Sequence, residues 1–303
     1  MAADGVLLFG ADGQLGHALQ DELSLLGRLI PLTLADVDIS DAKALQAVIR
    51  HHAPRYIVNA AAYTAVDKAE QEPALANAIN ATAPGIMAAE AKALGATMVH
   101  YSTDYVFNGQ SPHPYKESDA TDPLSVYGRS KRDGDVQVMA HAGAFFIFRS
   151  SWVVGAHGGN FLKTMLRLAQ ERDSLSVVAD QYGVPTSARW MAQVTREVLQ
   201  RSDHVVHSGL FHLSNAGQTT WHGYARYVLD QAARMGWSLK VHADDIKAIS
   251  TADYPLPAPR PANSMLDTSL LQQKFGLAIP AWQTGVDEVL ADLGGATRLS
   301  VCA

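Results

Sequence analysis

Cysteine, net charge and long apolar runs are all scarce in this sequence of 303 residues. Its single cysteine, Cys302, cannot form a disulfide within the chain, which is typical of a reducing compartment. The formal net charge of -6 disfavours nucleic acid or an anionic membrane as the main partner. No apolar stretch is long enough to cross a bilayer, and no basic residues precede the short apolar run at the N-terminus. We therefore expect a cytoplasmic protein without a signal peptide, a nucleic-acid partner or a membrane partner.

What is present is an alternation of short apolar runs and amphipathic stretches. Runs such as VLLF, YIVNAAA and TMVHYST are apolar almost throughout, which is typical of parallel strands covered on both faces. The pattern predicts an α/β fold, a doubly wound parallel sheet (Rossmann-type) over residues 1–150. Helical patterns dominate residues 151–303, which we expect to form mainly a smaller α/β lobe, with segments at about 186–215 returning to the main domain. The final stretch, GGATRLSVCA, is expected to be a loose tail.

Three glycines follow the first predicted strand, in the stretch LLFGADGQLGHAL. Gly10, Gly13 and Gly16 allow a tight turn and a close approach of the backbone to a pyrophosphate, which the next helix would bind through its free N–H groups. The spacing differs from G-x-G-x-x-G, and no Lys-Ser or Lys-Thr follows as in a P-loop. Glycines at these positions also suit an ordinary strand-to-helix turn, but their place in an alternating chain favours a dinucleotide site.

The second predicted strand bears on the choice of cofactor. A carboxylate at its end commonly binds the adenosine ribose of NAD, but here the strand ends at Thr33, and Asp36 and Asp38 come later. A missing acid removes one source of repulsion against a 2′-phosphate. We therefore expect NADPH or NADH to be accepted.

Tyr127 and Lys131 are four residues apart, which places them on one face of a helix. Thr103 ends an earlier predicted strand, at the edge where open parallel sheets bind ligands. A phenol near an ammonium is expected to have a lowered pKa and to exchange a proton with a ketone oxygen, while a threonine hydroxyl holds that oxygen. Tyr-x-x-x-Lys alone fits a solvated helix face equally well. The order glycine turn, strand-end Ser-Thr and then Tyr-x-x-x-Lys instead indicates an extended short-chain dehydrogenase/reductase.

Seven segments strengthen this interpretation: LLFGADGQLG, VNAAAYTAVDKAE, HYSTDYVFNG, YGRSK, NFLKTMLRLA, TWHGYA and PRPANS. Together, and in this order, they resemble the dTDP-4-dehydrorhamnose reductases from about Val6 to about Leu290. The resemblance implies NAD(P)H-dependent reduction of the C4 keto group of dTDP-4-dehydro-6-deoxy-L-mannose to dTDP-L-rhamnose. It also implies a cytoplasmic enzyme of dTDP-rhamnose biosynthesis whose second lobe binds the substrate.

The resemblance assigns roles to particular residues. Tyr127 would donate the proton, and Thr103 would bind the keto oxygen. Lys131 would adjust the pKa of Tyr127 and hold the cofactor. The cofactor would also contact the glycine turn, the second strand and the NAAAYT stretch, through Gly10, Gly13, Gln14, Leu15, Gly16, Asp38, Ile39, Ala60, Ala61, Ala62 and Tyr63. The substrate would be contacted by Thr64, Asp104, Tyr105, Trp152, Asn160 and Arg260. Two alternatives stay open: Trp152 also suits a core aromatic, and Arg260 also suits a solvated loop charge.

No metal site is expected. The twelve histidines have no cysteine or acidic partners at zinc-like spacing. Some similar reductases dimerise through a magnesium site built on glutamates, but this sequence has Ala18 and Arg189 at two of the matching positions. We therefore expect a monomer or weak homodimer without a magnesium-bridged interface.

Two other functions compete with a reductase. Dehydratases of this fold place Asp-Glu after the strand-end threonine, whereas Asp104 is followed here by Tyr105; an epimerase would retain NAD tightly. A reductase-like regulatory subunit would have no need for Thr103, Tyr127 and Lys131. All three are present.

Overall fold

The computed structural model of the chain describes residues 5–301. The first half contains, in order, β1 (Gly5–Phe9), α1 (Gln14–Ser24), β2 (Arg28–Leu32), α2 (Ala42–His52), β3 (Tyr56–Asn59), α3 (Val66–Ala69), α4 (Pro73–Asn77), η1 (Ala78–Thr82), α5 (Ala83–Leu94), β4 (Thr97–Thr103), η2 (Asp104–Val106), α6 (Val126–His141) and β5 (Ala144–Ser150). The second half contains β6 (Val153–Val154), α7 (Phe161–Glu171), β7 (Ser176–Val178), β8 (Tyr182–Gly183), β9 (Thr186–Ser187), α8 (Ala188–Gln200), β10 (Gly209–His212), β11 (Thr219–Thr220), α9 (Trp221–Arg234), η3 (Ala243–Asp245), β12 (Lys247–Ile249), η4 (Thr251–Asp253), α10 (Ser269–Phe275) and α11 (Trp282–Val301).

A six-stranded parallel sheet forms the centre, in the order β10-β5-β4-β3-β1-β2. The doubly wound parallel sheet predicted from the alternating pattern is confirmed. After β2 the chain crosses back to the other side of β1, so the strand order reverses between β1 and β3. In open sheets of this kind a crevice forms at that point, beyond the carboxyl ends of the strands.

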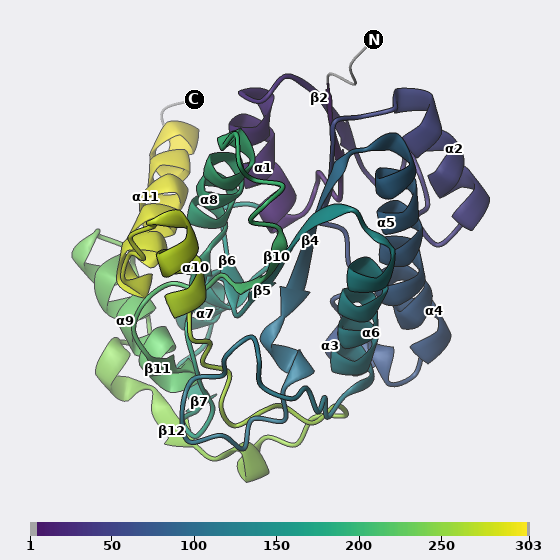
Figure 1. Cartoon of the computed structure of the whole chain (residues 1–303). Coiled ribbons are helices and arrows are strands. Elements are labelled where there is room, and N and C mark those ends of the chain that lie inside the picture. The colour runs from purple at the N-terminus through teal and green to yellow at the C-terminus, as the bar shows by residue number, and fades with distance from the viewer. Residues whose placement is uncertain (1–4, 302–303) are drawn as a thin grey trace.

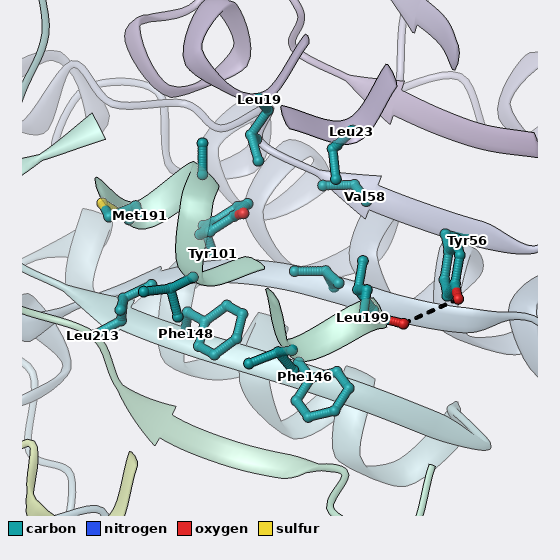
Figure 2. Packing of buried hydrophobic residues seen from close by; sticks show 14 of the residues in the cluster. Leu19, Leu23, Tyr56, Val58, Tyr101, Phe146, Phe148, Met191, Leu199 and Leu213 are labelled. Atoms are coloured by element: carbon teal, nitrogen blue, oxygen red, sulfur yellow. Dashed lines mark hydrogen bonds between the residues drawn. The ribbon is translucent and has the colours of Figure 1, made fainter. Parts of the chain in front are cut away.

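Helices cover both faces of the sheet (Figure 1). On one face, α1, α8 and α10 pack against apolar side chains of the central strands, including Val58, Phe146 and Phe148 (Figure 2). On the other face, α2 and α5 cover a second cluster that includes Leu7, Ile57 and Met98. Because both faces are covered, the strands are apolar almost throughout rather than alternating.

The second lobe has a core of its own, in which α7, α9 and α11 pack together around Leu166, Tyr224 and Val286. Two-stranded sheets pair β7 with β12, β8 with β11 and β6 with β9. The chain between residues 186 and 215 belongs to both parts: β10 is the edge strand of the large sheet, and α8 packs against α1. This interleaving brings loops of the second lobe close to the crevice.

The C-terminus differs from expectation. α11 continues from Trp282 to Val301, so a loose tail beginning at Gly294 is wrong, while Cys302 and Ala303 lie outside the described residues. No proline interrupts this segment, and Ala, Arg and Leu favour helix, which outweighs the cost of two adjacent glycines. None of the helices within residues 5–301 has an apolar stretch that could span a bilayer.

Candidate active site

The glycine turn lies where β1 passes into α1. Gly10 has a φ of +77°, and a Cβ placed there would lie 2.6 Å from the amide nitrogen of Ala61 in the loop after β3. A Cβ on Gly16 would overlap the carbonyl oxygen of Gly10 and lie 2.8 Å from the Cα of Ala11. Gly13 caps α1 without any side-chain hydrogen bond, so the first N–H groups of the helix are left for a ligand. The turn therefore fits a pyrophosphate.

A cavity of about 420 Å³ begins at this turn and runs along the carboxyl ends of β1, β2 and β3 to α6. Most of the predicted cofactor residues line it: Gly10, Gly13, Gln14, Leu15, Asp38, Ile39, Ala60, Ala61, Ala62, Tyr127 and Lys131. Thr64, predicted from the family resemblance to contact substrate, lines it too. Gly16 packs beneath the turn instead, and the Tyr63 phenol donates to Glu72 at 2.6 Å.

The cavity wall also contains Thr33, which the sequence placed at the end of the second strand, and residues that were not assigned to the cofactor: Phe9, Asp12, Leu32, Leu34, Val37, Ile79, Tyr101, Ser102 and Val153. Thr33 stands at the end of β2 as predicted, and both its amide and its hydroxyl donate to Asp36 at 2.8 Å. Asp38 accepts from the Ser40 hydroxyl at 2.7 Å. Both hydrogen-bonded carboxylates have lowered pKa values, so this end of the cavity is negatively charged at neutral pH.

Two of the three predicted catalytic residues, Tyr127 and Lys131, line the cavity, and Thr103 lies behind its wall, where its hydroxyl hydrogen-bonds with Tyr127. Thr103 is the last residue of β4, and Tyr127 and Lys131 lie one turn apart near the start of α6. Ser125 begins that helix by accepting a hydrogen bond from the Gly128 amide at 3.1 Å. Lys131 is only 2% exposed and donates to the Tyr101 carbonyl oxygen at 2.6 Å. The alternative of a solvated helix face is therefore excluded for this lysine.

Burial controls the electrostatics of the pair. It raises the pKa of Tyr127 to about 12, although a hydrogen bond with Thr103 acts in the opposite direction. It lowers the pKa of Lys131 to about 8, partly offset by the charge of Asp135 one turn further along α6. The expected lowering of the tyrosine pKa by the lysine is therefore wrong for this structure. Desolvation dominates the shift, and the lysine ammonium donates to a backbone oxygen of β4. The phenol stays protonated at neutral pH, as a proton donor requires.

Residues 4–294 match the family model described as RmlD substrate binding domain. The dTDP-4-dehydrorhamnose reductase of Salmonella typhimurium is 44% identical over 299 residues, which cover 97% of this chain and 99% of that protein. The chain belongs to the dTDP-4-dehydrorhamnose reductase family.

Further relatives agree with this family assignment. The Escherichia coli K12 dTDP-4-dehydrorhamnose reductase is 44% identical over 302 residues, covering 97% of this chain and 99% of that protein. The Bacillus anthracis dTDP-4-dehydrorhamnose reductase, solved in complex with NADP, has a TM-score of 0.88 at 34% identity and covers 96% of this chain and 99% of its own. The predicted family and fold are thus confirmed.

The residues that family resemblance assigns to substrate fall into two groups. Asp104, Tyr105 and Arg260 lie near the triad, with Asp104 accepting from the Thr103 hydroxyl at 3.0 Å. Trp152 lies in the second lobe, where it stacks on Trp221 at 3.6 Å and adopts a φ of +45°, an unusual backbone conformation for a bulky side chain. Asn160 lies at the glycine turn, where it donates to the Gln14 side chain at 2.8 Å. The structure does not bring Trp152 or Asn160 into contact with the triad.

Several residues that support the site were missed from the sequence. Asn80, in the π-helical turn η1, accepts from the Tyr63 amide at 2.8 Å and donates to the Ser130 hydroxyl at 3.0 Å. It thereby ties the cofactor loop to the catalytic helix. The only pattern at Asn80 is the glycosylation sequon Asn-Ala-Thr, which indicates nothing about this site. A π-helical turn of this kind is often found at functional sites, but no simple residue pattern predicts it.

The fully buried carboxyl of Asp104 yields a prediction on stability. Burial raises its pKa to about 6 from 3.8. Because the folded-state pKa lies above the unfolded one, Asp104 contributes stability below about pH 4 that is lost as the pH rises to about 6, roughly 3 kcal/mol in all. The variant Asp104→Asn keeps an acceptor oxygen but does not titrate. Its free energy of unfolding, measured by urea denaturation, should therefore rise relative to the unmodified protein by about that amount between pH 4 and pH 7. Parallel pH dependences of the two proteins would contradict the prediction.

Proposed function

We propose that Thr103, Tyr127 and Lys131 carry out the proton-transfer half of ketone reduction at the inner end of the cavity. The observation that carries the proposal is their convergence, buried, beside a glycine turn that fits a dinucleotide. As a family member, the chain is an NAD(P)H-dependent oxidoreductase that reduces the C4 keto group of dTDP-4-dehydrorhamnose to give dTDP-L-rhamnose. NADPH or NADH is its cofactor.

Each residue has a distinct task in this proposal. The bound cofactor supplies the hydride that reaches C4. Tyr127 gives its phenolic proton to the C4 oxygen, and Thr103 holds that oxygen in line with the phenol. Lys131 donates one N–H to the Tyr101 carbonyl oxygen and also lines the cavity, where its ammonium can bind the cofactor ribose. The glycine turn and the loop Ala60–Ala62 hold the pyrophosphate end.

The proposal is tested by generating the 4-keto-L-sugar nucleotide in situ and following the loss of nicotinamide absorbance. NADPH and NADH are supplied in separate reactions, so that their kcat/KM values give the preference. A reductase consumes one reduced cofactor for each sugar converted and releases the oxidised form. Turnover without net consumption, with NAD retained through purification, would instead favour an epimerase. A stoichiometric enzyme partner in a pull-down without any ketone reduction would favour a regulatory subunit.

The face that carries α1, α8 and α11 supports a proposal on the oligomeric state. We propose a cytoplasmic monomer or weak homodimer without a bridging metal. Arg189 lies 2.7 Å from Asp292 and 3.9 Å from Glu288, so a cation of the protein already pairs with carboxylates on this face. No cluster of three metal-ligating side chains occurs among the residues that the structure describes.

This face leads to a prediction with a direct measurement. EDTA is expected to leave the mass in solution unchanged, because the Arg189 guanidinium already pairs with the carboxylates that a magnesium ion would need as ligands. Light scattering coupled to gel filtration, with and without EDTA, checks it. An EDTA-induced fall in mass would show that a divalent metal joins the subunits after all.

A further inference from the structure

A loop of the second lobe, residues 258–266, reaches back to the end of β4. Asn263 donates to the carbonyl oxygens of Ser111 and His113 at 2.8 and 3.0 Å. A hydrogen bond from Ser264 stabilises the charged form of Asp104, the neighbour of the catalytic threonine. The loop packs so closely on Gly109 that a Cβ there would lie 2.6 Å from the Ala262 nitrogen. This loop therefore packs against the segments that follow β4 and is not a solvated connection.

Arg260 fastens the loop to the cofactor-binding domain. Its guanidinium makes two parallel hydrogen bonds to Asp67, at 2.6 and 2.7 Å, and a third to the Ala258 carbonyl oxygen at 2.5 Å. Asp67 also accepts from the Ala258 amide at 3.1 Å. The hydrogen bonds from Arg260 hold the pKa of Asp67 below its usual value, so the pair stays charged. A planar fork facing a carboxylate is the geometry in which arginine binds most strongly.

A series of contacts connects Arg260, through Tyr105, to the catalytic Tyr127. The guanidinium hydrogen-bonds with the Tyr105 phenol. Burial raises the pKa of this phenol, and the charge of Arg260 offsets part of that rise. The Tyr105 ring meets the edge of the Tyr127 ring, with centroids 5.6 Å apart at 76°. The carbonyl oxygen of Tyr105 also packs against Gly128, so closely that a Cβ on that glycine would overlap it. A displacement of Tyr105 would therefore move the proton donor.

We propose that Arg260 and Asp67 form a positioning pair that locks loop 258–266 against Tyr105 and so fixes the Tyr127 phenol. The role is distinct from the substrate contact that the family resemblance implied, in which Arg260 would bind the diphosphate of the sugar nucleotide. Arg260 is not among the residues lining the cavity, and its fork is already paired with a carboxylate. The inference rests on the proposed role of Tyr127 as the proton donor.

A double-mutant cycle tests the pair, using Arg260→Gln, Asp67→Asn and the double variant. For each protein kcat, the KM for the sugar nucleotide, and the Kd for dTDP and NADPH are measured. A positioning role predicts that each single change lowers kcat about tenfold or more, since misplacement of about 1 Å can cost up to a hundredfold. The Kd values should change by less than threefold, and the double variant should be no slower than the slower single variant.

A diphosphate contact predicts a different result. Arg260→Gln would then weaken dTDP binding tenfold or more, while Asp67→Asn would not, and that outcome overturns the proposal. An unchanged kcat in both single variants, or losses that simply multiply in the double variant, overturns it equally.

Two further variants serve as controls. Arg167→Gln removes an exposed ion pair with Glu171 and should leave kcat unchanged. If Arg260→Gln does not fold, Tyr105→Phe replaces it, because this change removes only the phenolic oxygen that meets Arg260. Tyr105→Phe should lower kcat without changing the affinity for dTDP. An unchanged kcat in this variant overturns the proposal. Turnover by the unmodified protein in the same assay tests the proposed function separately.

Discussion

Replacing Tyr127 with phenylalanine is expected to lower kcat by about a hundredfold to ten-thousandfold, the usual contribution of a general acid. The phenol is buried, hydrogen-bonded to Thr103 and still protonated at neutral pH because burial raises its pKa to about 12. Phenylalanine keeps the ring and its edge contact with Tyr105. The affinity for NADPH should therefore change by less than about twofold. Steady-state kinetics and fluorescence titration of NADPH measure the two quantities.

A matched control comes from another buried tyrosine. Tyr56 donates its phenolic hydrogen to the Leu199 carbonyl oxygen at 3.2 Å in the core beneath α8 (Figure 2). Tyr56→Phe removes the same atom from the protein and should cost about 1 kcal/mol of the free energy of unfolding, with kcat unchanged. If Tyr127→Phe retained turnover within tenfold of the unmodified protein, as Tyr56→Phe should, Tyr127 could not be the proton donor.

The fold could be predicted from local patterns because each strand of a covered parallel sheet is apolar throughout. Once the sheet is parallel, the carboxyl ends of its strands meet at one edge. This placed Gly10 and Thr103 at the same edge of the sheet from the pattern alone, whereas Ala60 was assigned by the family resemblance. The four-residue spacing added Tyr127 and Lys131 on one face of a helix.

What could not be predicted depends on contacts between segments far apart in the chain. Arg260 and Asp67 are separated by 193 positions, so only the folded register reveals that the loop arginine already has a carboxylate partner. The burial of the site residues could not be predicted from the sequence either. A four-residue spacing shows that a phenol and an ammonium are neighbours, but it does not show that the lysine is 2% exposed. Burial of this extent reverses the expected direction of the tyrosine pKa shift.

The contacts that hold Lys131 against β4 and β3 could not be predicted from the sequence either. His100 on β4 lies 3.3 Å from the lysine nitrogen, and its other ring nitrogen lies 3.1 Å from the Asn59 amide. Burial and the nearby lysine hold the pKa of His100 well below its usual value, so the ring is neutral at neutral pH. In the sequence both residues are polar interruptions of apolar strands. Their shared role in holding the catalytic lysine becomes visible only when β3 and β4 pair.

Replacing Gly16 with alanine is expected to have the second large effect, on binding rather than on proton transfer. The added methyl group would overlap the Gly10 carbonyl oxygen and lie 2.8 Å from the Ala11 Cα. These are backbone atoms at the turn that fits the pyrophosphate, so the turn itself must shift. We expect the NADPH Kd to rise tenfold or more, and the free energy of unfolding to fall by about 1–3 kcal/mol.

Two other glycines separate the steric effect on the turn from the general effect of adding a methyl group. A Cβ on Gly159 meets no atom within 4 Å, so Gly159→Ala should leave both NADPH affinity and stability unchanged. A Cβ on Gly13 lies 3.4 Å from the Gly10 oxygen, an ordinary contact, yet Gly13 lines the cavity. Gly13→Ala should therefore fold normally and still bind NADPH less tightly, because the methyl group obstructs the ligand and not the protein. If titration and urea denaturation gave the same values for Gly16→Ala as for Gly159→Ala, the close approach of Gly16 to Gly10 would have no part in forming the site.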